Sequence, residues 1–201
     1  MAKDFNLSEC SEKIKCGSVG IFPTDTVVGL GCRFDSVEGI TRIRGIKGIK
    51  DTSPLAVLIS SAEQLETLKV RKSRIFNKLV EKLWPGPLTI VATAEEGYPC
   101  SGKGNSLGIR MPDSDLLRTM IEEAGVPIAA TSANLHGRPA PKLIEDVDSE
   151  IVDAVDCKIE LPIKSLGVPS TVIAIVAGEI KVIRVGGVEE VEILAALSEE
   201  D

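Results

Sequence analysis

The sequence predicts an α/β domain in which a twisted, mixed parallel and antiparallel sheet is flanked by helices. Short apolar runs of strand length alternate with longer amphipathic segments, which is typical of strands covered by helices. Two of the strand-like runs are separated only by Ala177-Gly178, the spacing of a β-hairpin, so part of the sheet is expected to be antiparallel. No repeat or low-complexity stretch divides the 201 residues, so we expect one domain over residues 1–201.

In the first half of the chain, apolar runs and capping residues define the expected elements. Val19-Gly20-Ile21-Phe22 is a short apolar run that Pro23 ends, and the Thr-, Asp- and Gly-rich residues after it are expected to form a turn. Asp35-Ser36 and Ser61 carry side chains that cap helices, and Pro85-Gly86-Pro87 ends one. The elements expected here are a strand at 18–23, a helix from Asp35-Ser36 to about Lys47, a strand at 55–59, and helices at 61–68 and 73–84.

The second half of the chain continues the same alternation. Residues 95–105 are rich in glycine and polar residues and are predicted to form a loop or flap. Residues 113–124 have the apolar spacing of an amphipathic helix. The other elements expected are strands at 88–93, 106–111 and 126–130, a hairpin of strands at 170–176 and 179–185, and a short helix at 189–197.

The composition argues against several classes of function. With 23 basic and 30 acidic residues the formal charge is −7, so no overall positive field would attract DNA. A run of about 18 apolar residues, which a membrane span needs, is missing from the sequence. The five cysteines lack Cys-x-x-Cys spacing and His136 is the only histidine, so we expect no metal site and no Ser-His-Asp triad. We expect a cytoplasmic protein without membrane contact.

Polar residues that follow or end the apolar strands are the candidates for chemistry. Hydroxyl, amide and guanidinium groups at strand ends are typical of ligand pockets in α/β folds. Each segment also has an ordinary interpretation, such as a capped turn, a solvated helix end or a surface ion pair. The segments are residues 23–31, 47–55, 106–112, 131–139, 169–172 and 184–187.

Taken in order, these segments resemble the YrdC-type threonylcarbamoyl-AMP synthase family over essentially the whole chain. Several matches in the same order and at similar spacing are far more specific than any one of them. The matching residues are Pro23-Thr24-Asp25-Thr26-Val27-Val28-Gly29-Leu30, the region of Lys47, Trp84-Pro85-Gly86-Pro87-Leu88-Thr89, Gly108-Ile109-Arg110-Met111-Pro112, Thr131-Ser132-Ala133-Asn134-Leu135 and Pro169-Ser170-Thr171-Val172.

The resemblance implies a single-domain YrdC-like fold around a large central cavity and a nucleotidyltransferase activity. The family joins L-threonine, bicarbonate and ATP into threonylcarbamoyl-AMP and pyrophosphate, for the N6-threonylcarbamoyladenosine modification of tRNA. It implies Mg²⁺ with the ATP, a tRNA-modifying transferase complex as partner, and a weak RNA contact. In-line positioning and neutralised phosphate charge can drive such a transfer without a histidine base.

The resemblance also implies roles for individual residues. Lys47 and Arg110 are the implied catalytic residues, with Arg110 clamping the threonine carboxylate. The residues implied to hold threonine are Thr26, Arg110, Ser132 and Ser170. The residues implied to hold ATP are Lys47, Ser53, Ser106, Asn134, Lys142 and Arg184.

The chain departs from the family pattern at several of these segments. Many members have arginine at the position of Ile49, which cannot contact a phosphate, and Lys50 is shifted by one residue. If the lost charge limits ATP use, Ile49→Arg should raise kcat/KM for ATP. The other departures are Val28, Ser53, Leu58 and His136.

Two other functions are compatible with the residues. A YrdC-like RNA- or nucleotide-binding module without synthase activity is the first alternative, because the arginine is missing. One basic face would then bind RNA weakly, with steep salt dependence; its candidates are Arg42, Arg44, Lys47, Lys50, Arg71, Lys72 and Arg74. A regulatory small-molecule sensor is the second alternative, and no motif favours it.

Overall fold

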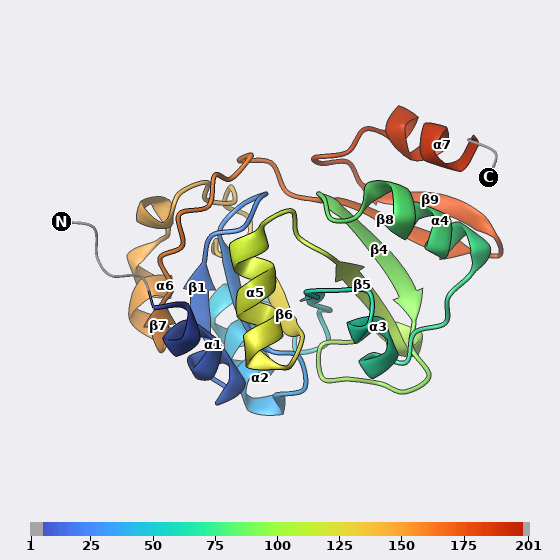
Figure 1. Cartoon of the computed structure of the whole chain (residues 1–201). Helices are drawn as coiled ribbons and strands as arrows, with labels where there is room; N and C mark the ends of the chain where they lie inside the picture. The colour runs from blue at the N-terminus through green and yellow to red at the C-terminus, as the bar shows by residue number, and fades with distance from the viewer. Residues whose placement is uncertain (1–5, 199–201) are drawn as a thin grey trace.

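Within residues 6–198, the part of the chain described by the computed structural model, nine strands form one mixed sheet (Figure 1). Their order across the sheet is β7-β1-β2-β6-β3-β5-β4-β8-β9. The pairs β1–β7, β3–β5 and β4–β8 are parallel and the other pairs are antiparallel, which confirms the mixed sheet. The strands are β1 (Gly20–Phe22), β2 (Gly29–Arg33), β3 (Ala56–Leu58), β4 (Leu88–Thr93), β5 (Ser106–Arg110), β6 (Ile128–Ser132), β7 (Cys157–Lys158), β8 (Thr171–Val176) and β9 (Glu179–Arg184).

Helices cover the sheet and enclose two apolar clusters. One cluster joins α1 and α5 to β1 and β6, with Ile14, Phe22, Leu117 and Ile128 fully buried. The larger cluster includes residues of α2 and α4 and runs through the middle of the sheet. In Figure 1, α1 and α5 lie together in front of the left part of the sheet, while α4 and α7 lie at its far end. The helices are α1 (Leu7–Lys15), α2 (Val37–Lys47), α3 (Gln64–Thr67), α4 (Arg74–Leu83), α5 (Asp115–Ala124), α6 (Ser149–Ala154) and α7 (Glu190–Ser198), with short 3-10 turns at Lys103–Asn105 and Ile144–Asp146.

Local capping chemistry sets several helix ends. The hydroxyls of Ser36, Ser73 and Ser114 accept backbone N–H groups at the starts of α2, α4 and α5. Helix α2 ends at Gly48, whose φ of 63° is a left-handed conformation that suits glycine. The predicted cap at Ser61 is wrong, because α3 begins three residues later and Glu63 precedes it without a side-chain cap.

Two strands differ from the predicted boundaries in a way that matters for the site. Residues 29–33, predicted as part of a turn, form β2 between β1 and β6. A Cβ on Gly31 would lie 2.7 Å from the carbonyl oxygen of Ala129, so glycine here permits close strand packing and does not mark a turn. Strand β6 continues to Ser132, which places Thr131 and Ser132 inside the sheet. Helices α1 and α6 and strand β7 lie outside the predicted set.

Residues 160–169, which we call the strap, connect β7 to β8 across the molecule (orange in Figure 1). The strap is bonded to the turn after β1. The Ser165 hydroxyl donates to the Thr24 carbonyl (2.5 Å), and the Leu166 and Gly167 amides donate to the Asp25 and Thr26 carbonyls (both 2.7 Å). These bonds hold the Thr24-Asp25-Thr26 backbone in place from outside the sheet.

Candidate active site

A cavity of about 330 Å³ lies where the turn after β1 meets the middle strands of the sheet. Its wall combines threonine and serine hydroxyls with small and apolar residues from the turn, β3, β4, β5, β6, β8 and β9. Arg110 and Arg184 are the charged residues among those that line it. Six of the predicted site residues share this wall: Thr26, Ser106, Arg110, Ser132, Ser170 and Arg184.

Arg110, the last residue of β5, is fixed in the cavity wall by three acceptors. Its Nη1 donates to the Thr26 hydroxyl (2.7 Å), its Nε donates to the Gly86 carbonyl (3.1 Å), and its Nη2 is paired with Asp25. The side chain is 6% exposed. Burial lowers the pKa of Arg110, and the attraction of Asp25 opposes that shift. The result is a cationic group with a fixed orientation, suited to bind a carboxylate.

The turn after β1 is organised by the Thr24 hydroxyl. This hydroxyl accepts the backbone amides of Thr26 (3.1 Å) and Val27 (3.2 Å) and donates to the Val27 carbonyl (2.7 Å). It also lies 2.9 Å from the Thr26 hydroxyl. Such hydroxyl–backbone bonds stabilise a tight turn, and here they direct Thr26 toward Arg110.

Elsewhere in the cavity wall, Ser170 and Arg184 come together just before β8 and at the end of β9. Arg184 donates to the Ser170 carbonyl from Nε (3.1 Å) and Nη2 (2.7 Å), and Nη2 also lies 3.2 Å from the Ser170 hydroxyl. That hydroxyl lies 2.8 Å from the Thr89 hydroxyl. Burial lowers the pKa of Arg184. A buried, hydroxyl-rich surface and a guanidinium therefore face the same space.

Lys47, predicted to bind ATP, does not line the cavity and bonds to protein carbonyls instead. Its Nζ donates to the Ser132 carbonyl (2.5 Å), the Asn134 carbonyl (2.7 Å) and the Asn134 side-chain oxygen (3.4 Å). The residue is 6% exposed, and burial lowers its pKa to about 8. Lys47 thus joins the end of α2 to the end of β6, directly behind Ser132.

Three other residues expected around ATP also lie outside the cavity wall. The Asn134 side chain contacts Lys47 and the backbone of the following loop, and its Oδ1 also accepts the hydroxyl of the wall residue Ser132. Ser53 is half-buried beside the wall residue Pro54, and its carbonyl accepts a bond from Arg44 (2.9 Å). Lys142 is exposed and lies against the strap, since a Cβ on Gly167 would be 2.8 Å from its Cδ. Asn134 and Ser53 thus adjoin wall residues, whereas Lys142 lies against the strap.

Asp25 is a functional candidate to which the sequence motifs assign no role. It follows β1 in the same turn as Thr26 and is 7% exposed. One carboxylate oxygen is paired with Arg110, whereas Oδ2 has no hydrogen-bond partner among the described residues. A buried carboxylate directly after an apolar strand was the available signal, but its partner on β5 lies 85 residues away in sequence.

The described residues that line the cavity include no histidine, cysteine, aspartate or glutamate. His136 is exposed, as expected for a loop residue. Burial raises the pKa of Cys32 to about 12 and that of Cys100 to about 11, so both thiols are protonated at neutral pH. Between residues 6 and 198, no three His, Cys, Asp or Glu side chains are grouped to hold a metal ion. None of the described helices has the length and apolar character to cross a membrane.

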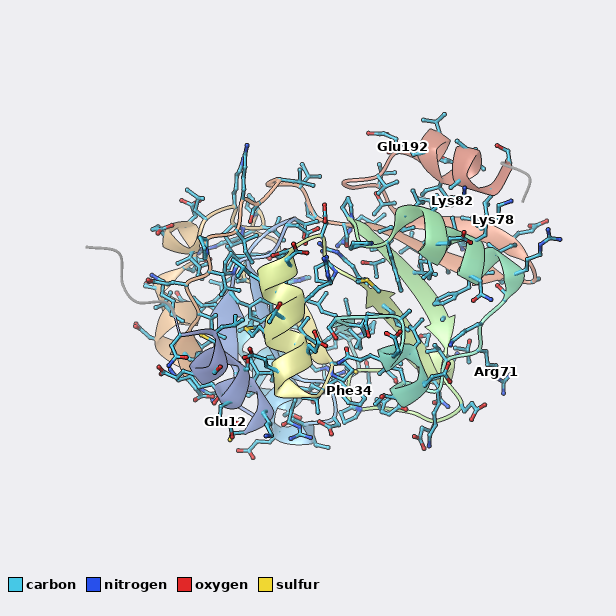
Figure 2. All side chains as sticks on the ribbon, viewed as in Figure 1. Glu12, Phe34, Arg71, Lys78, Lys82 and Glu192 are labelled. Carbon is cyan, nitrogen blue, oxygen red and sulfur yellow. The ribbon has the colours of Figure 1, made fainter. Side chains whose placement is uncertain are left out.

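The residues considered for a basic RNA-binding face differ in exposure and in their partners. Arg44 and Lys47 are buried, and Arg42 is paired with Asp156 (2.7 Å). Lys72 is paired with Glu66. Figure 2 shows Arg71 extending from the outer edge of the molecule, away from α2.

A family model matches most of the chain, and two curated relatives of similar sequence share one activity name. The family model Sua5_yciO_yrdC, described as "Telomere recombination", matches residues 12–186. A threonylcarbamoyl-AMP synthase of Pyrococcus abyssi is 35% identical over 183 residues, or 89% of this chain and 54% of that protein. A threonylcarbamoyl-AMP synthase of Bacillus subtilis is 30% identical over 203 residues, or 96% of this chain and 57% of that protein. The chain therefore spans a little over half the length of these relatives.

Solved structures with the same fold extend this similarity. The crystal structure of P. abyssi Sua5 complexed with L-threonine matches with a TM-score of 0.89 and 32% identity, covering 96% of this chain and 57% of that one. E. coli YciO matches with a TM-score of 0.82 over 93% of this chain and 92% of that one. At 22% identity, YciO shows the common fold alone.

Proposed function

The chain belongs to the Sua5/YciO/YrdC family, and from this premise we propose that it is an L-threonylcarbamoyladenylate synthase. It would form threonylcarbamoyl-AMP and pyrophosphate from L-threonine, bicarbonate and ATP. The observation that carries the proposal is that two guanidinium groups, those of Arg110 and Arg184, line the same hydroxyl-rich cavity. One can bind the carboxylate of an amino acid while the other neutralises phosphate charge.

The amino acid binds at the Arg110 end of the cavity in this proposal. Arg110 clamps its carboxylate, and the hydroxyls of Thr26, Ser132 and Ser170 surround the rest of the molecule. The related P. abyssi Sua5 has been crystallised in complex with L-threonine, which supports this choice of substrate.

The nucleotide binds toward Ser106 and Arg184, which line the same cavity. Lys47 supports this site indirectly, through the carbonyls of Ser132 and Asn134. Ser53, Asn134 and Lys142 would contact ATP only after the loops that carry them rearrange around it.

The reaction has two bond-forming steps that this cavity can position. The threonine amine adds to the carbon of bicarbonate, a carbamate forms, and the displaced hydroxide leaves as water with a proton from the amine. A carbamate oxygen then attacks the α-phosphorus as the bond to pyrophosphate breaks. The protein's contribution is to align the carbamate with the phosphate and to stabilise developing negative charge.

Mg²⁺ enters this proposal as part of the substrate, bound to the ATP phosphates. The charged residues of the cavity wall are arginines, and the described residues hold no cluster of three metal ligands. This donor set does not fit a resident cation, whereas Mg²⁺ commonly binds through substrate phosphates and water.

The cell context follows from the product. Threonylcarbamoyl-AMP is an activated intermediate, so we place the enzyme in the cytoplasm beside a tRNA-modifying transferase complex that consumes it. We also propose that residues 1–201 act as one catalytic domain. Residues 1–5 and 199–201 lie outside the described part of the chain.

Pyrophosphate release by the purified chain tests the proposal. With Mg-ATP and bicarbonate, release should depend on L-threonine, and mass spectrometry should detect the threonylcarbamoyl adenylate. Arg110→Ala should abolish release, whereas Arg42→Ala, which removes an ion-paired arginine on the surface, should not. Folded protein that releases no pyrophosphate would refute the synthase and favour the nucleotide- or RNA-binding module.

A further inference from the structure

Asp25 is a buried carboxylate that faces an arginine of the cavity wall. Its side chain is 9% exposed, its Oδ1 is paired with Arg110, and its Oδ2 lacks a hydrogen-bond partner among residues 6–198. A half-satisfied buried carboxylate costs stability, because its lost hydration is only partly replaced. Such costly groups are concentrated at functional sites.

The backbone that carries Asp25 is held rigidly. The Leu166 amide of the strap donates to the Asp25 carbonyl (2.7 Å), and the hydroxyl of Thr24 bridges the neighbouring amides. Because the turn is fixed on both sides, the carboxylate presents a fixed acceptor to Arg110.

Asp25 controls how Arg110 can meet a ligand. A guanidinium has five N–H groups, and three acceptors already hold one each: Asp25, the Thr26 hydroxyl and the Gly86 carbonyl. The two remaining N–H groups therefore have a fixed direction. Without Asp25 the Nη2 group would lose its charged partner, and the guanidinium would be held only by two neutral oxygens.

Because of Asp25, the two arginines of the cavity differ in how far their positive charge is neutralised. Arg110 is neutralised by a buried carboxylate, whereas the hydrogen-bond partners of Arg184 in the described structure are the carbonyl and hydroxyl of Ser170. A polyphosphate is therefore attracted more strongly to the Arg184 end. A singly charged carboxylate needs less positive charge and can bind at the Arg110 end.

We propose that Asp25 is a positioning residue that orients Arg110 and reserves it for the substrate carboxylate by keeping phosphate away. This inference rests on the proposed synthase function and assigns the residue that separates the two substrates. Asp25 acts through Arg110 and touches neither substrate.

The test compares Asp25→Asn with Asp35→Asn. Asparagine keeps an acceptor oxygen at position 25 and removes the charge, so the fold is expected to be retained. Asp35 makes the same kind of contact with an arginine, Arg33 (2.6 Å), but lies on the surface outside the cavity, so its variant is a matched control. Asp25→Ala removes the acceptor as well.

For Asp25→Asn we expect KM for L-threonine to rise by about tenfold or more, because a charge-assisted bond is weakened. KM for ATP should change far less. Pyrophosphate should become an inhibitor that competes with threonine, since Arg110 is no longer neutralised. Asp25→Ala should show a larger rise, and Asp35→Asn should match the original protein in all three measurements.

Failure of this inference can be separated from failure of the proposed function. If the original protein forms the adenylate but Asp25→Asn leaves KM for threonine unchanged and pyrophosphate noncompetitive with threonine, the role of Asp25 is refuted. An equal fall in kcat with both KM values unchanged would also refute it, because a merely structural role predicts that pattern. If the original protein forms no adenylate, the proposed function fails. Side-chain NMR of Arg110 then tests the positioning itself: restricted guanidinium rotation should be lost in Asp25→Ala, and unchanged rotation would refute the contact.

Discussion

Lys47 and Asn134 are joined twice, since the Lys47 ammonium donates to both the backbone carbonyl (2.7 Å) and the side-chain oxygen (3.4 Å) of Asn134. Its third contact, to the Ser132 carbonyl, is 2.5 Å long. An ammonium has three N–H groups, so each has an acceptor within the protein. The end of α2 is thereby connected to the strand end that carries Ser132 into the cavity wall.

Replacing Lys47 with methionine should therefore weaken threonine binding and not only ATP binding. The carbonyls behind Ser132 would lose their buried donor, at a cost of about 1–3 kcal/mol. Calorimetric titration with L-threonine in the absence of nucleotide measures this directly. Lys50→Met, at an exposed lysine three residues away, is the control. Unchanged threonine affinity together with a large rise in KM for ATP would show that Lys47 is a phosphate ligand instead.

The buried position of Lys47 also predicts a pH dependence of stability. Burial lowers its pKa to about 8, while the unfolded chain keeps the ordinary lysine value of 10.5. Between these values the unfolded state binds more protons, so the free energy of unfolding should rise with pH in that window. Below pH 8 both states are protonated and this contribution to the slope disappears. Urea unfolding should show the rise in the original protein relative to Lys47→Met; parallel pH profiles would contradict it.

Arg184→Ala should impair ATP use more than threonine binding. The guanidinium faces the cavity without a carboxylate among its hydrogen-bond partners in the described structure, so its charge is available to phosphate. Loss of a charged hydrogen bond corresponds to a rise of about 10- to 100-fold in KM for ATP. Arg184→Lys should not restore it, because lysine cannot reproduce two donors on Ser170. Steady-state kinetics tests both variants, and Lys181→Ala on the same strand should behave normally.

Ile49→Arg should destabilise the protein without improving ATP use. Ile49 is half-buried, packs against the main apolar cluster and lies outside the cavity wall. An arginine there must leave that contact, at a cost of about 1–3 kcal/mol. Denaturant unfolding and kcat/KM for ATP should be measured on the same sample. A stable variant with a higher kcat/KM would show that position 49 reaches the phosphates.

Two glycine substitutions should have opposite effects on stability. A Cβ at Gly186 would lie 2.1 Å from the Pro169 carbonyl, next to Ser170, so Gly186→Ala should destabilise by about 1–3 kcal/mol and lower activity. A Cβ at Gly45 meets nothing within 4 Å, and this residue lies in α2, so Gly45→Ala should stabilise by about 1 kcal/mol. Thermal unfolding of both variants checks the pair; equal shifts would contradict the close approach at Gly186.

The sequence predicted most elements because local chemistry determines them. Ser36, Ser73 and Gly48 define helix ends by bonds within a few residues. Strand β2 was missed because one of its glycines, Gly31, is explained by the neighbouring strand β6, nearly 100 residues away. The contrast between local and long-range determinants also applies to the site. Motif matching found Thr26, Arg110 and Arg184. The bonds of Lys47 to the Ser132 and Asn134 carbonyls and the pairing of Asp25 with Arg110 depend instead on residues distant in sequence.

The strap has a consequence for how the protein is made. The Thr24 carbonyl emerges early from the ribosome, but its partner, the Ser165 hydroxyl, is 141 residues later. At about 5–20 residues per second, the turn after β1 waits about 7–28 seconds for the chain that secures it. The geometry of the candidate site therefore forms late in synthesis, and a nascent chain truncated before the strap has the Thr24-Asp25-Thr26 motif without the bonds that hold its backbone.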